Sequence, residues 1–199
     1  MAPVWDRMTR GTEEAGLREL RQGLVADATG RVLEIGAGTG ANVPHYNGSI
    51  ESLVLTEPQP AMLRRLQRTA HERAPHAEVL RAPAEDLPFE TDSFDTVVCT
   101  LVLCGVDDQP RAVREARRVL RPGGSLLFLE HLRADDPDLA RLQDRMNWLN
   151  RIVVGCDCNR PTLRTIEAEG FTVSRLEHTE TPKAPKFARP MIVGTAIAS

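Results

Sequence analysis

The feature that most constrains the fold is the segment RVLEIGAGTG, residues 31–40. In it, a short apolar run ending at Ile35 is followed by glycine at alternate positions: Gly36, Gly38 and Gly40. Glycine has no Cβ and tolerates positive φ, so the pattern predicts a buried strand ending in a loop that can approach a ligand closely. Residues 41–46 are expected to begin a helix whose free N–H groups face the same ligand.

Strand and helix patterns alternate along the rest of the chain. Further strands are predicted at residues 51–56, 77–81, 94–103, 125–130, 171–178 and 190–198. Helices are predicted at residues 12–26, 60–74, 109–120 and 137–154, followed by a short helix capped by Asn159 or Thr162 that ends at Gly170. This order predicts an α/β fold: a doubly wound, seven-stranded, mostly parallel sheet with one antiparallel terminal strand and helices on both faces.

Length and charge limit the class of protein. The 199 residues predict a single domain over 1–199, in which residues 1–28 form an arm and a helix that could cover the substrate site. The net charge of −3, with both signs interspersed, gives no indication of nucleic-acid binding. No stretch approaches membrane-spanning length and no signal peptide is recognisable, so we expect a cytoplasmic protein without a membrane anchor.

The four cysteines, at positions 99, 104, 156 and 158, do not follow zinc-ribbon spacing. Two thiols from the short loop around Asp157 do not complete a tetrahedral site, so no metal is predicted. Cys99 and Cys104 lie in or beside an apolar strand and are interpreted as buried small hydrophobic residues.

The glycine spacing and two carboxylates indicate the ligand. The dinucleotide fingerprint is G-x-G-x-x-G, whereas the third glycine here comes one residue earlier. Glu34 precedes the loop, where it disfavours a pyrophosphate and suits a ligand that carries an ammonium group. Glu57 ends the second strand, where an acidic residue can accept hydrogen bonds from both hydroxyls of a ribose. S-adenosylmethionine fits these features better than NAD.

Several motifs together resemble the class I S-adenosylmethionine-dependent methyltransferases, which have a Rossmann-like sheet. They are VLEIGAGTG, LTEP, AEDLPF, FDTVVCTLVL and RVLRPGG, within residues 31–131. The segments VVCTLVLCGV, LEHL, GCDCNRPTL and ARPMIVGTAIA extend the likeness to residue 198 and are similar to the alkyl-thiol methyltransferases of the methyltransferase-like seven group. Those relatives carry a hydrophobic N-terminal anchor that this chain lacks, so membrane attachment is not carried over.

The resemblance implies a cofactor site. It places the three loop glycines under the methionine part and ribose of the cofactor, and Glu57 and Pro58 at the ribose. It implies that Glu34 orders the loop and the ammonium end, while Thr100 and Leu101 line the methionine side. Glu85, or backbone groups around Ala84, would contact the adenine, because Pro83 stands where related enzymes often have Asp.

Candidate residues for the methyl acceptor come from four segments. His131 follows the fifth strand and is either a general base, a substrate contact or a solvated loop histidine. Trp5 is either a packing residue or part of a lid. His45 and Tyr46 could face the cofactor or the substrate. The loop with Asp157, Asn159 and Arg160 is expected to shape the acceptor pocket.

The expected reaction is S-methylation of a small-molecule thiol that leaves S-adenosylhomocysteine. A thiol with a pKa of about 8.5 is partly ionised at neutral pH and needs no strong general base. The alternatives are O-, N- or C-methylation of a quinol precursor, amine or phenol, a nicotinamide oxidoreductase, or a non-catalytic module that binds the cofactor. The protein is expected to be a monomer or a homodimer.

Overall fold

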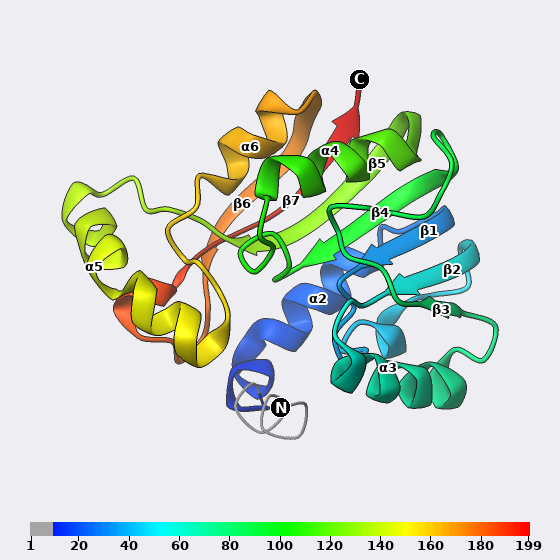
Figure 1. Ribbon diagram of the computed structural model, residues 1–199, viewed down its shortest axis with the longest axis horizontal. Coiled ribbons are helices and arrows are strands. Elements are labelled where there is room, and N and C mark those ends of the chain that lie inside the picture. Colours follow the sequence, from blue (N-terminus) through cyan, green and yellow to red (C-terminus); the bar gives the residue numbers. More distant parts are fainter. Residues whose placement is uncertain (1–9) are drawn as a thin grey trace.

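The computed structural model describes residues 10–199, so Trp5 lies outside the described residues. The chain forms a seven-stranded sheet with the order β3-β2-β1-β4-β5-β7-β6 (Figure 1). The strands are β1 (Gly30–Ile35), β2 (Ile50–Thr56), β3 (Glu78–Leu80), β4 (Phe94–Thr100), β5 (Leu120–His131), β6 (Phe171–Glu180) and β7 (Pro190–Ala198).

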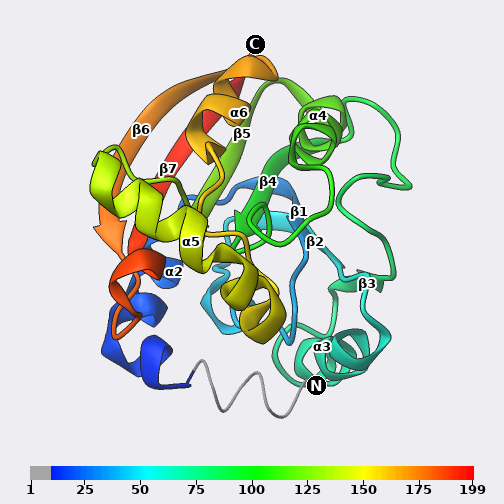
Figure 2. The same cartoon turned by 60° about the vertical axis from the view of Figure 1, so that its left-hand side comes forward.

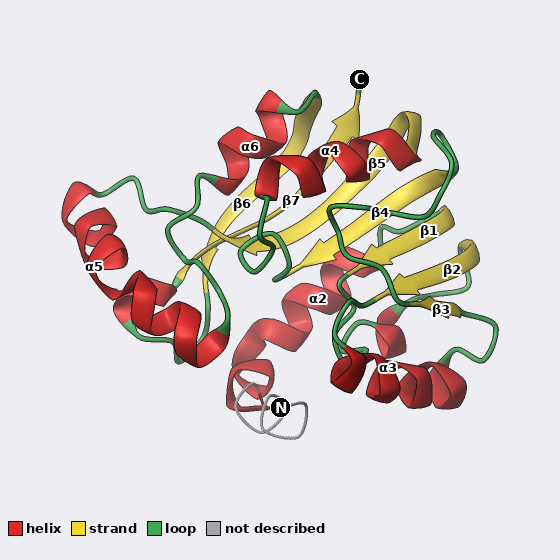
Figure 3. Cartoon of the chain, viewed as in Figure 1, coloured by secondary structure: helices red, strands yellow, loops and turns green. Residues whose placement is uncertain are grey.

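The strand directions confirm the predicted fold class. Strands β1 to β5 pair in parallel, whereas β7 is antiparallel to both of its neighbours, β5 and β6 (Figure 3). Between β6 and β7 the chain forms only the short turn η3 (Lys186–Ala188), which is enough to connect antiparallel strands. The last strand in sequence therefore lies one position inside the sheet edge.

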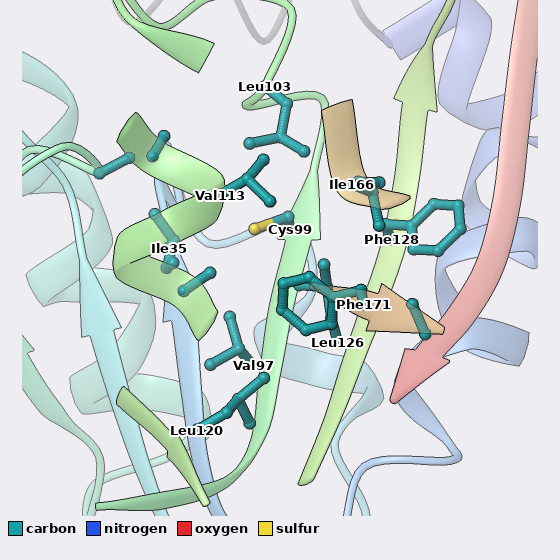
Figure 4. Close-up of a cluster of buried hydrophobic side chains, with 14 of the residues drawn as sticks. Ile35, Val97, Cys99, Leu103, Val113, Leu120, Leu126, Phe128, Ile166 and Phe171 are labelled. Atoms are coloured by element: carbon teal, nitrogen blue, oxygen red, sulfur yellow. The ribbon is translucent and has the colours of Figure 1, made fainter. Parts of the chain in front are cut away.

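Helices cover both faces of the sheet, as predicted. They are η1 (Glu13–Leu17), α2 (Arg18–Val25), α3 (Pro60–Arg73), α4 (Gln109–Val119), α5 (Pro137–Val154) and α6 (Thr162–Ala168). Figure 1 places α4 and α6 on one face and α2 and α3 on the other. Alternate residues of one strand supply the two cores: Leu33 and Ile35 pack in the cluster with α4 and α6, and Val32 packs in the cluster with α2 and α3. Figure 4 shows the first cluster.

The long helix α5 has the bounds that the sequence predicts. The Asp136 side chain accepts a hydrogen bond from the Leu139 N–H at its start, and Gly155 ends it in the left-handed conformation, with φ of 75°. Figure 1 shows α5 beyond the ends toward which β1 and β4 point, and Figure 2 brings its length into view. Helix α5 therefore borders the edge where ligands of such sheets bind.

Two local predictions are wrong. Residues 41–46 form no α-helix but the single turn η2 (Val43–His45), because the chain enters β2 at Ile50 and has no room for several helical turns. Strand β4 ends at Thr100 and not at residue 103, since Leu101 takes a left-handed φ of 59° that extended backbone does not allow. Both changes lengthen the loops at the carboxyl end of the sheet.

Candidate active site

The glycine loop after β1 has room for a ligand at one position. Gly36, Gly38 and Gly40 all have positive φ, of 61°, 61° and 90°. A Cβ on Gly36 would lie 2.8 Å from a Val102 methyl group, and one on Gly40 would lie 3.0 Å from a Thr69 methyl group. A Cβ on Gly38 would meet nothing within 4 Å. The outer glycines thus allow close packing of the chain, and Gly38 leaves the open cradle.

Glu57 stands at the edge of this cradle. Its carboxylate accepts hydrogen bonds from the N–H groups of Gly38 (3.0 Å) and Gln59 (2.8 Å), and the side chain is buried. Burial raises the pKa of the carboxyl group, and the two N–H donors oppose that shift. A carboxylate has about four lone-pair sites, so two acceptor sites remain for a pair of hydroxyls. The residues present therefore fit a ribose, and the contact itself stays a prediction.

Glu34 lies under the loop and is only 1 % exposed. One of its oxygens accepts from Asn42 Nδ2 (2.9 Å) and the other from the Tyr46 hydroxyl (2.8 Å). Burial raises the pKa of Glu34 to about 7. Because both carboxylate oxygens have partners inside the protein, Glu34 orders the loop through its bonds to Asn42 and Tyr46. An effect of Glu34 on the ammonium group of a cofactor would be transmitted through these two residues.

Arg21 extends this network to the N-terminal helix. Its Nη1 donates to Asn42 Oδ1 (3.2 Å) and to Thr100 Oγ1 (2.7 Å), and its Nε pairs with Glu13 (3.0 Å). Asn42 Nδ2 also donates to Thr100 Oγ1 (2.9 Å). Helix α2 is thereby fixed to the ends of β1 and β4. Sequence reasoning missed Arg21 and Asn42, since neither helical spacing nor the glycine pattern identifies them.

The loop after β4 is held by a second buried carboxylate. Glu130 accepts hydrogen bonds from the N–H groups of Val102 (2.7 Å), Leu103 (3.0 Å) and Cys104 (3.4 Å). Burial raises the pKa of Glu130, and these N–H donors oppose the shift. Leu101, before this turn, donates its N–H to the Leu129 carbonyl (2.8 Å). The signal for Glu130 was present: a carboxylate ends the apolar segment SLLFLE.

The segment expected near the adenine, around Ala84 and Glu85, contacts the residues that lead into α4. Glu85 is half-buried and accepts hydrogen bonds from the N–H groups of Asp107 (2.8 Å) and Asp108 (3.4 Å). Ala84 is buried, and the carbonyl of Pro58 accepts from Arg81 Nε (3.0 Å). Glu85 therefore fixes the loop between β3 and β4 to the start of α4. Its contact with adenine stays a prediction.

His131 is the last residue of β5 and is 9 % exposed, so it is not a solvated loop histidine. Its Nε2 lies 3.0 Å from Thr181 Oγ1 and its Nδ1 lies 3.3 Å from Cys156 Sγ. Burial lowers the pKa of His131, but the neighbouring Cys104 and Glu130 raise it by more, so the net shift is upward. A role as general base would require one of the two ring contacts to break first.

The loop after α5 makes its polar contacts within the protein. Asp157 accepts from Asn147 Nδ2 (2.8 Å), Arg160 Nη2 (2.6 Å) and Arg151. Burial raises the pKa of Asp157, but Arg160 and Asn147 outweigh it and hold the pKa below its ordinary value. Arg160 also donates to the Val106 carbonyl (2.7 Å), which joins this loop to the loop after β4.

The predicted cap of the short helix α6 is wrong. Asn159 Nδ2 donates to Asp144 Oδ1 (2.9 Å), and Thr162 Oγ1 donates to the His131 carbonyl (2.8 Å). Neither side chain accepts from the first turn of α6, which begins after Pro161 without a side-chain cap. Both side chains instead fix this loop against α5 and the end of β5.

The predicted substrate residues His45 and Tyr46 lie in or directly after the turn η2, which follows the glycine loop. Tyr46 uses its hydroxyl on Glu34, while His45 is half-buried in η2, where burial lowers its pKa. The structure thus places Tyr46 against Glu34 and His45 near the charged groups of Arg18 and Glu13, and places Asp157 and Arg160 against the loop after β4. Among residues 10–199, no helix is both long and apolar enough to cross a membrane.

Comparison with known proteins supports the same class. A family described as a methyltransferase domain matches residues 33–128. The chain is 34 % identical to the thiol S-methyltransferase TMT1A of Homo sapiens, over 83 % of this chain and 70 % of that protein. It is 34 % identical to the ubiquinone/menaquinone biosynthesis C-methyltransferase UbiE of Hahella chejuensis, over 71 % of this chain and 54 % of that protein.

A solved structure shares the fold. It is an S-adenosylmethionine-dependent methyltransferase of Thermotoga maritima, described as a possible histamine N-methyltransferase. The TM-score is 0.72 at 22 % identity, and the match covers 99 % of this chain and 96 % of that one. The glycine cradle, the buried strand-end carboxylates and these matches agree. The chain belongs to the family of S-adenosylmethionine-dependent methyltransferases.

Proposed function

We propose that the protein transfers the methyl group of S-adenosylmethionine to a small-molecule thiol and releases S-adenosylhomocysteine and a methyl thioether. The observation that carries this proposal is the similarity to the human thiol S-methyltransferase, which covers 83 % of this chain and is therefore longer than the segment 33–128 that the methyltransferase domain matches. The loop after α5 lies against the loop after β4, at the carboxyl end of the sheet, where ligands of such folds bind.

The cofactor, when bound, supplies a methyl group already activated by the positive sulfonium. The protein must then hold the two reactants in line, which can account for much of the rate acceleration. Gly38 provides the space and Glu57 the acceptors for the ribose hydroxyls. The network of Arg21, Asn42 and Thr100 holds the surrounding loops rigid.

The state of the ionisable groups favours a thiol over a hydroxyl acceptor. The carboxylates of Glu34, Glu57 and Glu130 each accept at least two hydrogen bonds within the protein. Both ring nitrogens of His131 also have internal partners. An alcohol would need a strong base, whereas a thiol with a pKa of about 8.5 is a few per cent thiolate at neutral pH.

The second candidate is methylation of carbon, as the name of the Hahella chejuensis relative indicates for that protein. That relative matches a smaller share of its own length than the human thiol methyltransferase does. The similarity is also compatible with a shared cofactor domain alone. We therefore rank C-methylation of a quinol precursor second.

A panel of matched acceptors tests the proposal. The protein is incubated with labelled S-adenosylmethionine and an alkyl thiol, the alcohol and amine of the same carbon skeleton, a phenol and a quinol. We expect transfer to the thiol, with one S-adenosylhomocysteine formed for each thioether. Transfer only to oxygen, nitrogen or carbon would refute the thiol assignment. Separate titrations with S-adenosylmethionine and with NAD test the oxidoreductase alternative. We expect only S-adenosylmethionine to bind, and binding of NAD would favour an oxidoreductase.

A further inference from the structure

Three soft donor side chains from distant parts of the chain meet at the end of β5. Cys104 lies in the loop after β4, His131 ends β5, and Cys156 follows α5. Their two sulfur atoms and one imidazole nitrogen all lie within 4.8 Å of one another, and Cys156 Sγ is 3.3 Å from His131 Nδ1. All three residues are buried, with exposures of 1 %, 9 % and 6 %.

The spacing of these atoms suits a shared metal ion. Zinc binds cysteine sulfur at about 2.3 Å and histidine nitrogen at about 2.0–2.1 Å, so two donors of one tetrahedral ion are separated by about 3.5–3.8 Å. The distance of 3.3 Å between Cys156 Sγ and His131 Nδ1 is near that range, and no two of the three donor atoms are more than 4.8 Å apart, so shifts of at most about 1 Å would bring them onto one ion. Thiolate and imidazole are also the donors that zinc and other soft ions prefer over oxygen ligands.

The backbone at each donor is held by a hydrogen bond from another segment. The Cys104 carbonyl accepts from the Asp157 N–H (2.7 Å), the His131 carbonyl from Thr162 Oγ1 (2.8 Å), and the Cys156 carbonyl from Asn150 Nδ2 (2.7 Å). Donors fixed in this way keep their geometry before an ion arrives, which is what a functional metal site requires.

The ring of His131 has the support that metal-binding histidines usually have. Its Nε2 lies 3.0 Å from Thr181 Oγ1, whereas Cys156 Sγ contacts the other ring nitrogen, Nδ1. A partner on the far nitrogen fixes the ring orientation and the tautomer, and leaves Nδ1 as the donor atom toward the sulfurs. Thr181 is therefore the outer partner of the site.

We infer that Cys104, His131 and Cys156 form a binding site for one soft metal ion, with Zn²⁺ as the ion that the donor set suits. The positive ion would offset the charge of two buried thiolates beside the carboxylate of Glu130. Three protein donors leave the fourth position of a tetrahedral ion for a water molecule or a small exogenous ligand. This inference does not depend on which acceptor is methylated.

In the sequence, Cys156 and Cys158 belong to one short loop, and that spacing predicts no metal. The structure separates the two thiols: Cys158 Sγ lies 3.8 Å from Asn147 Oδ1 and is not part of the group. Cys156 instead meets a cysteine 52 positions earlier in the chain. Loop spacing alone could not reveal this combination.

Metal content and spectroscopy test the site on the full chain. The protein is purified under reducing conditions, stripped of metal, dialysed against excess Zn²⁺ and then against metal-free buffer, and assayed for metal by mass spectrometry. We expect one ion per chain. With Co²⁺ in place of Zn²⁺, we expect a near-ultraviolet absorption band from thiolate ligands. No retained ion, or a cobalt spectrum without that band, would overturn the inference.

Variants show which residues bind the ion. Cys104→Ser and Cys156→Ser should each weaken Zn²⁺ binding by roughly 100-fold, and Thr181→Val by about tenfold. Cys158→Ser is the matched control, because it changes a buried thiol two positions away and should keep one ion. Equal loss of metal in Cys158→Ser would contradict the assignment. Substitution of a buried residue can cause misfolding, so a second experiment uses the unmodified protein. It measures whether Zn²⁺ protects Cys104 and Cys156 from alkylation. Alkylation at the same rate with and without Zn²⁺ would also refute the site.

Discussion

Replacing Glu57 by glutamine tests the cofactor site most sharply. In the proposed complex the carboxylate accepts two ribose hydroxyls while it keeps its bonds to the N–H groups of Gly38 and Gln59. Hydrogen bonds to a charged group contribute about 1.5–3 kcal/mol each, and neutral ones about 0.5–1.5 kcal/mol. Glutamine retains one acceptor oxygen and loses the charge, so the expected loss is about 3 kcal/mol, or roughly a 150-fold rise in Kd.

Calorimetric titration with S-adenosylmethionine measures this change, and Glu51→Gln is the control. Glu51 is exposed near the start of the same strand, so its substitution should leave Kd unchanged. Titration with an analogue that lacks the ribose hydroxyls completes a double-mutant cycle. The hydroxyls should matter in the unmodified protein and little in Glu57→Gln. Equal losses in both proteins would refute the ribose contact, even if Glu57→Gln also lowers Tm.

Three further predictions concern the loops around the site. Burial raises the pKa of Glu34 from 4.5 to about 7, although Tyr46, Arg21 and Asn42 each lower it. The carboxyl group therefore binds its proton more tightly in the folded state than in the unfolded state. The free energy of unfolding should therefore fall by about 3 kcal/mol as pH rises through that window. In urea titrations Glu34→Gln should lack this slope, and parallel pH profiles would contradict the shift. Gly38→Ala should fold, at a cost of about 1 kcal/mol in the free energy of unfolding, but should show no measurable cofactor binding because its Cβ fills the cradle. The control Gly48→Ala should bind the cofactor normally. If Gly38→Ala binds the cofactor with the Kd of the unmodified protein, the cradle is not used. Arg160→Lys should lower Tm, because it loses hydrogen bonds to Asp157 and the Val106 carbonyl that contribute about 2 kcal/mol. The control Arg164→Lys changes an exposed residue and should leave Tm unchanged. Equal melting curves for the two variants would refute the stabilising role of Arg160.

The sheet was predictable because each strand has a local signature. Runs such as those in β1 and β4 are apolar on both faces, and Gly155 marks the end of α5 through its left-handed conformation. The predictions failed where tertiary contacts override local preference. Residues 41–46 favour a helix locally, but the short distance to β2 leaves room for one turn only. Leu101 favours a strand, but its φ of 59° starts the turn that Glu130 binds.

The candidate site divides in the same way. The cradle and Glu57 follow from a motif and a strand end, which are local in sequence. The Arg21 network and the meeting of Cys104 with Cys156 join residues that are 79 and 52 positions apart, and only the folded chain brings them together. Asn159 and Thr162 have the composition of caps, yet their side chains bind Asp144 and the His131 carbonyl.

The most direct test of the central claim uses an acceptor that carries one thiol and one hydroxyl group on the same short carbon chain. The protein is given this acceptor with S-adenosylmethionine labelled in its methyl group, and the labelled atom is located by mass spectrometry and NMR. Thiol methylation predicts the label on sulfur alone, with an equal amount of S-adenosylhomocysteine. Label on oxygen, or cofactor binding without any transfer to this or other thiols, would contradict it.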